Sequence, residues 1–177
     1  MRYILPLGLI FAAASSLANA QSLKGHNSDA PVDVDADRIE IQDRSDRAIF
    51  SGNVRVKQAG LTLSSARLTV AYAKGGGSDV AIERLDATGG VVVTSATETA
   101  RGDIAIYDLP RRLITMLGAV TLVQRQNQIR GGRLVIDLTT GRAVVDGNAV
   151  GTPGTTTQKA GGRVSGRFTV KSDAKPQ

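Results

Sequence analysis

The nine residues at positions 48–56 read AIFSGNVRV, and they carry the pattern that decides the fold. Apolar or small side chains occupy alternate positions on both sides of Gly52, and apart from Ile49 the residues between them are polar or charged. A two-residue period of this kind is typical of a β-strand with one buried face. A glycine inside such a strand indicates a bulge or a sharp bend. The stretch therefore predicts a strand that bends in its middle.

The same pattern recurs around three later glycines, which makes it an internal repeat. The spacing is 29 residues for the last two steps and 37 for the first, which an insertion at 75–78 lengthens. Such units cannot bury an apolar face alone, so neighbours must stack into one core, as a sheet pair or an open barrel. The four anchors with their apolar or small residues at offsets −4, −2 and +2 are Gly52 (Ala48, Phe50, Val54), Gly89 (Leu85, Ala87, Val91), Gly118 (Ile114, Met116, Val120) and Gly147 (Ala143, Val145, Ala149). The second strand of each unit begins at Ala66-Arg67-Leu68, Gly102-Asp103-Ile104 and Gly132-Arg133-Leu134, which lie 14, 13 and 14 residues after the anchor.

The start of the chain has the pattern of an export signal. Arg2 precedes a short apolar run, and Ala18-Asn19-Ala20 places small residues where a signal peptidase cuts. We expect cleavage after Ala20 and a periplasmic mature protein. The expected organisation is a signal peptide at 1–20, a flexible segment at 21–31, a β domain at 32–150, a linker at 151–162, and a basic final strand and tail at 163–177.

The residue inventory argues against an enzyme. The chain has no cysteine and a single histidine, His26, so thiol chemistry, catalytic triads and histidine metal sites lack material. The acidic residues of 33–40 alternate with small apolar ones, which is typical of the charged outer face of an edge strand. Aromatic residues make up 3% of the chain, which disfavours nucleic-acid binding. We therefore expect no catalytic residue, no metal, no cofactor and no nucleic-acid partner.

Three stretches of the chain form a recognisable set. They are Gly52-Asn53-Val54-Arg55-Val56, then Ala100-Arg101-Gly102-Asp103 with Tyr107-Asp108 behind it, and the run QIRGGRLVIDLTTGRA at 128–143. Together they resemble the LptA/OstA-like family of lipopolysaccharide transport proteins. The preceding Ala36-Asp37-Arg38-Ile39-Glu40 looks like the usual opening of that domain. Gly118-Ala119-Val120 departs from the family's Gly-Asn-Val. The resemblance covers about Val32 to Val150 and implies an all-β fold, a curved antiparallel β-jellyroll or β-taco.

The resemblance also implies a function. Proteins of this family hold the acyl chains of lipopolysaccharide (the lipid A part) in an interior groove, and they stack head to tail between an LptC-like inner-membrane protein and an LptD-like outer-membrane protein. Candidate stacking edges are Val32 to Ile41 and Arg163 to Lys171. The residues alone leave open whether the interior is a lipid groove or a closed, dry core. They also leave open a β-rich envelope scaffold, a glycan-binding module, or a β-helix enzyme. The expected lipid-binding residues are Phe50, Val54, Val56, Leu68, Val70, Val91, Val93, Ile104, Ile106, Ile114, Met116, Val120, Leu122, Leu134 and Ile136.

Overall fold

The computed structural model describes residues 26–74, 80–147 and 162–169, and this part of the chain is built almost entirely of β-strands. The one helical element among the described residues is a single 3-10 turn, η1 (Asp43–Ser45). The predicted all-β fold is confirmed. The strands are β1 (Asp33–Asp35), β2 (Arg38–Gln42), β3 (Arg47–Gln58), β4 (Leu61–Lys74), β5 (Val80–Thr94), β6 (Glu98–Asp108), β7 (Leu113–Gln124), β8 (Asn127–Asp137), β9 (Arg142–Asp146) and β10 (Ser165–Arg167).

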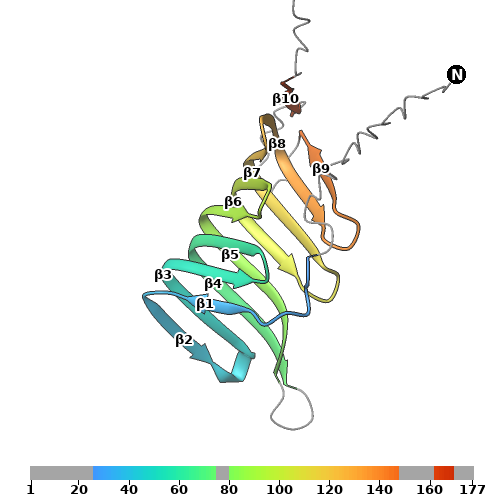
Figure 1. Ribbon diagram of the computed structural model, residues 1–177. Coiled ribbons are helices and arrows are strands. Elements are labelled where there is room, and N and C mark those ends of the chain that lie inside the picture. Colours follow the sequence, from blue (N-terminus) through green and yellow to red (C-terminus); the bar gives the residue numbers. More distant parts are fainter. Residues whose placement is uncertain (1–25, 75–79, 148–161, 170–177) are drawn as a thin grey trace, which may run out of the picture.

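All ten strands belong to one antiparallel sheet that follows the order of the chain. From β3 to β8 each strand pairs with the next one in sequence. Two short strands finish each end, because β1 and β2 both pair with β3, while β9 and β10 both pair with β8. Figure 1 shows these strands winding upward from β2 to β10 as a continuous ribbon.

The long strands bend at the glycine anchors. The register between paired strands shifts at residues 51–54, 88–91 and 117–120, which are β-bulges around Gly52, Gly89 and Gly118. Two successive residues have positive φ in each bulge; at Gly118 and Ala119 the values are 77° and 31°. A glycine is needed at Gly118 for a second reason, since a Cβ there would overlap the Asp103 carboxylate on the neighbouring strand. The predicted bends at three of the four anchors are therefore confirmed.

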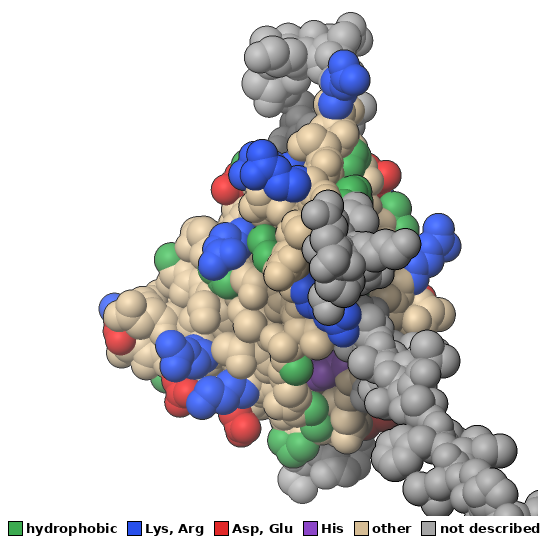
Figure 2. Space-filling view, turned by 45° about the horizontal axis from the view of Figure 1, so that its top comes forward, with side chains coloured by type: hydrophobic (Ala, Val, Ile, Leu, Met, Phe, Trp, Pro, Cys, Tyr) green, Lys and Arg blue, Asp and Glu red, His purple; other side chains and the backbone are tan. Residues whose placement is uncertain are grey.

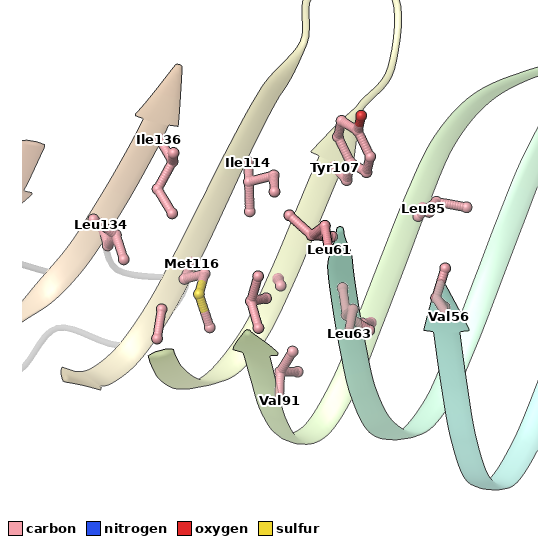
Figure 3. Close-up of a cluster of buried hydrophobic side chains, with 14 of the residues drawn as sticks. Val56, Leu61, Leu63, Leu85, Val91, Tyr107, Ile114, Met116, Leu134 and Ile136 are labelled. Carbon is pink, nitrogen blue, oxygen red and sulfur yellow. The ribbon is translucent and has the colours of Figure 1, made fainter. Parts of the chain in front are cut away.

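The bends lie side by side across the sheet and divide it into two halves that enclose the core (Figures 1 and 3). Half-sheet A contains residues 38–51, 67–74, 80–88, 104–117 and 133–146, with β2 and β9 at its edges. Half-sheet B contains residues 33–35, 54–65, 91–102, 120–131 and 165–167, with β1 and β10 at its edges. We call the space between them the trough, and the edge of each half-sheet farthest from the bends its rim.

The fourth anchor behaves differently. Gly147 follows the end of β9 and shows no positive φ, so it is not a mid-strand bulge. Ala143 and Val145 nevertheless pair with Ile136 and Leu134, in line with the repeat. The expected final strand is present as the short β10. The signal peptide, the insertion at 75–78, Ala149 and most of the linker lie outside the described residues.

In the repeat that begins at Gly89, the sequence pattern places the second strand, β6, one residue out of register. The bulge residue Gly89 faces Ala66 and Gly118 faces Asp103, so the equivalents are Ala66, Asp103 and Gly132, each 14 residues after its anchor. The comparison of the internal repeats predicts Gly102, and not Asp103, as the residue equivalent to Ala66 and Gly132. A shift of one residue moves every side chain of a strand to the opposite face. The prediction that Ile104 and Ile106 point inward is therefore wrong: Ala105 and Tyr107 do, and Ile104 is 38% exposed.

Candidate functional site: the trough between the half-sheets

The inner face of half-sheet A consists of two apolar rows that cross the whole sheet. Antiparallel pairing sets these residues directly opposite one another on successive strands, so each row is a continuous band of contacts. The first row is Ile39, Phe50, Leu68, Ala87, Ala105, Met116, Leu134 and Val145. The second row is Ile41, Ala48, Val70, Leu85, Tyr107, Ile114, Ile136 and Ala143.

Half-sheet B supplies the opposite wall. One row there pairs Val34, Val56, Leu63, Val93, Ala100, Leu122 and Ile129 across seven strands. Figure 3 shows side chains from both walls pointing into the same space, among them Leu63, Met116 and Leu134. The central side chains are almost inaccessible, with Leu68, Met116 and Leu134 at 0%. The trough is thus filled by its own side chains.

Thirteen of the fifteen residues expected to bind lipid lie on these inner faces. Twelve are buried, and Phe50 is half-buried and packs against the core. Ile104 and Ile106 lie on the outer face, as described above. The buried hydrophobic residues that are not in the expected lipid-binding set are Leu61, Leu63, Leu85, Ala87, Ala100, Ala105, Tyr107 and Leu138. A strict 14-residue offset would have placed Ala105 and Tyr107 correctly, and Leu85 and Ala87 already belonged to the repeat.

Both apolar rows of half-sheet A reach the surface at the β2 end of the sheet. Ile39 and Ile41 on the edge strand β2 continue the two inner rows, yet they are 53% and 65% exposed because no strand lies beyond them. Val164 and Phe168, beside β10 at the other end, are also exposed. Both ends of the trough therefore present apolar side chains next to unpaired strand edges.

The rim of half-sheet B is polar on its inner face. Gln58 ends β3 and is 2% exposed, and Glu98 begins β6 at 6%. Gln124 donates a hydrogen bond to the Glu98 carboxylate, and Asn127 is the Cα partner of Gln124 on β8. The rim of half-sheet A is apolar at Ile136 and Leu138, apart from the Tyr107 hydroxyl. The trough thus has an apolar floor and, along one rim, amides and one carboxyl group that are interrupted by Leu61.

The two rims meet where Tyr107 donates a hydrogen bond of 2.9 Å from its hydroxyl to Gln58 Oε1. Burial raises the pKa of the Tyr107 phenol above its ordinary value of 10.0, so the hydroxyl keeps the proton that it donates. Residues 26–35, which we call the strap, cross the trough at this point. The backbone carbonyls of Ser28 and Ala30 accept hydrogen bonds from Gln58 Nε2 at 2.8 and 3.0 Å.

Further contacts hold the strap at both rims. His26 Nε2 lies 3.1 Å from Gln58 Oε1, and Asp29 forms an ion pair of 3.0 Å with Arg112 in the turn between β6 and β7. The strap then enters half-sheet B as β1. Figure 1 shows this blue segment running from β1 toward the β6–β7 hairpin, and in Figure 2 the single histidine, in purple, lies at the surface. The strap therefore spans the opening between the rims.

The described ranges hold neither a metal-binding cluster nor a membrane-spanning helix. No group of three or more His, Cys, Asp or Glu side chains that could hold a metal ion occurs within residues 26–74, 80–147 and 162–169. Across the same residues, no helix has the length and apolar character needed to span a membrane.

The fold and the trough define a class of protein: a single antiparallel sheet, folded along a line of bulges, that encloses an apolar interior and exposes apolar side chains at both ends. The model of one family, described as LptA/(LptD N-terminal domain) LPS transport protein, matches residues 33–142, and the chain belongs to this family. An uncharacterised protein of Rhizobium meliloti (strain 1021) is 33% identical over 149 residues, which is 79% of this chain and 80% of that protein.

A solved structure has the same fold. It is LptH of Pseudomonas aeruginosa, described as the LptA-homologous periplasmic component of the conserved lipopolysaccharide transport device. The TM-score is 0.66, and the match covers 82% of this chain and 99% of that one. Sequence identity is 19%, so this likeness concerns the fold.

Proposed function

We propose that this protein is a non-enzymatic periplasmic carrier that moves lipopolysaccharide from the inner to the outer membrane. Its membership of a lipopolysaccharide transport family supports this cargo, and the periplasmic description of LptH together with the export signal expected at 1–20 supports this location. The observation that carries the proposal is the pair of apolar rows on half-sheet A, which run unbroken from β2 to β9. Acyl chains gain about 0.8 kcal/mol for each methylene that leaves water, so such rows can hold lipid without specific polar contacts.

The trough must widen to accept a lipid, because its own side chains now fill it. The two half-sheets are joined along the bends, where the ladder of backbone hydrogen bonds is interrupted. Opening the rims about this line would expose the apolar rows while each half-sheet keeps its strand pairing. The thirteen inward residues named above are the proposed lipid contacts.

We further propose that copies associate head to tail, and that the same edges meet LptC-like and LptD-like partners. The alternation of strand direction lets β2 of one copy pair antiparallel with β9 of the next, and β1 with β10. In that arrangement Ile39 and Ile41 would lie beside Val145 and Ala143 of the neighbour, and both inner rows would continue across the joint. Unpaired edges with apolar side chains favour such strand addition.

Photo-crosslinking in the envelope tests the lipid proposal. A benzoylphenylalanine at Phe50 keeps an aromatic ring on the inner face, and the same residue at Ile104 is the outward control. Lipopolysaccharide adducts at Phe50 and not at Ile104 are the expected result. A folded protein without adducts at Phe50 would instead support a scaffold whose core stays closed.

The stacking proposal has its own test. Replacing Ile39 and Ile41 by Asp should lower the oligomer size measured by light scattering. Val80→Asp is the matched control, because Val80 is 59% exposed and lies away from both sheet ends, on β5. Equal effects of the two changes would contradict association through β2.

A further inference from the structure

The buried amide of Gln58 is placed as a ligand-binding group at the junction of the apolar floor and the polar rim. Its side chain is 2% exposed, and its neighbour across the hairpin is Leu61, which is also 2% exposed. Both hydrogen bonds donated by Nε2 end on carbonyl oxygens, those of Ser28 and Ala30. Oε1 accepts from Tyr107 on the opposite rim, which fixes the direction in which Nε2 points. The site therefore recognises carbonyl oxygens at the opening of an apolar trough.

The strap that supplies these carbonyls is held by polar contacts and by one short strand. Val32 and Val34 pack against the core and Ser28 is buried, but Asn27, Asp29 and Pro31 are exposed. The ion pair from Asp29 to Arg112 joins side chains that are 80% and 44% exposed, so water screens it strongly. β1 has only three residues paired with β3. The strap takes no part in the pairing among β3 to β8, so its release would leave those pairings in place.

A lipid in the trough would need the same position. Its acyl chains would lie on the floor, and the ester or amide carbonyls that join the chains to the head group would then lie at the rim, beside Gln58. Farther along that rim, beyond Leu61, lie the polar side chains of Glu98, Gln124 and Asn127. The strap and the head of the lipid are therefore alternatives for one set of hydrogen bonds.

We propose that Gln58 is the polar anchor of the lipid site, which holds the acyl carbonyls at the head of the bound lipid, and that the strap occupies this anchor until lipid displaces it. This inference rests on the proposed carrier function and names the group that positions the lipid. Tyr107 is a positioning residue, since it acts by orienting the Gln58 amide.

Locking the strap in place tests the displacement step. The chain has no cysteine, so Asp29→Cys with Arg112→Cys gives two unique thiols that a short, reducible bis-maleimide can join across the opening. Asp43→Cys with Lys74→Cys is the matched control, because it replaces another exposed ion pair, of 3.5 Å, away from the strap. Retention of purified lipopolysaccharide by the immobilised mature chain should fall at least tenfold when the strap is locked and return when the linker is cleaved.

The outcomes separate the two ideas. Failure of the unlinked chain to retain lipopolysaccharide contradicts the carrier function itself. Equal retention by locked and cleaved protein, with the unlinked chain still binding, overturns the strap inference alone.

A change at Gln58 tests the anchor. Gln58→Glu keeps the size of the side chain but removes both N–H donors, and Gln128→Glu on the outer face of β8 is the control. We expect Gln58→Glu to lower the yield of the 29–112 crosslink and also to lower lipopolysaccharide retention about tenfold. A residue that only latched the strap would release it and leave retention equal or higher, and that result would refute the anchor.

Discussion

The assignment of inner and outer faces makes a direct prediction for two side chains of equal size. Leu134 and Ile104 each lose three carbons when replaced by Ala, but Leu134 is 0% exposed and Ile104 is 38% exposed. At about 0.8 kcal/mol per methylene, the transfer cost for Leu134→Ala is about 2.4 kcal/mol. The cavity left between Met116 and Val145 raises the expected loss of unfolding free energy to about 3 to 4 kcal/mol. Ile104→Ala should cost about 0.5 to 1 kcal/mol, because its side chain stays in contact with water.

Urea unfolding followed by circular dichroism measures both changes. With an m value of about 2 kcal/mol per molar, the midpoint should move by about 1.5 to 2 M for Leu134→Ala and by less than about 0.5 M for Ile104→Ala. Equal shifts of the urea midpoint, or a larger shift for Ile104→Ala, would refute the register of β6. Ile104 would then point inward, as the internal repeats predict.

Three further changes test other parts of the structure. Gly118→Ala should lower the free energy of unfolding by more than about 1 kcal/mol, since φ there is +77° and a Cβ would meet Asp103. Gly60→Ala is the control and should have little effect, because its Cβ would meet nothing within 4 Å. The thermal unfolding midpoints of the two variants measure the difference. Hydrogen bonds from the Thr140 and Thr139 backbone hold the pKa of Asp137 below its usual 3.8, so its stabilising effect is complete above that pH and is lost as the pH falls through the lowered pKa. As the pH is lowered below 3.8, the melting temperature of Asp137→Asn should therefore fall less than that of the wild type. An identical fall in both proteins would show that ionised Asp137 does not stabilise the fold. Truncation at Gly151 removes β10 but keeps β9, so the remaining protein should fold and bind lipid yet associate poorly; unchanged oligomer size in light scattering would count against it.

The alternation of apolar residues and the spacing of the glycines were sufficient to predict the strands, the bends and most of the inner face. They succeeded because a bulge requires positive φ at a fixed place, and glycine marks that place at Gly52, Gly89 and Gly118. The error at Ile104 and Ile106 arose because the outer face of β6 carries these two isoleucines, whereas the inner face carries Ala105 and Tyr107, so local hydrophobicity favoured the wrong register. Only the opposing strand, which sets Asp103 against Gly118, fixes the register.

The polar part of the site could not be predicted in the same way. Gln58, Tyr107 and the strap are brought together from positions 49 and 30 residues apart, and no local pattern links them. The contact of His26 with Gln58 depends entirely on how the strap crosses the opening. Long-range hydrogen bonds of this kind are visible only once the sheet is folded.

The chain-order pairing of the sheet has a consequence for how the protein folds. From β3 to β8 every strand pairing joins sequence neighbours, so each hairpin can form by closing a short loop and the next can add to it. An all-β chain with such local connections avoids the slow search that distant strand pairing imposes. The contact from Asp29 to Arg112 spans 83 residues, the largest separation among the hydrogen bonds of the described residues. The strap should therefore dock last, after the hairpins have formed and paired.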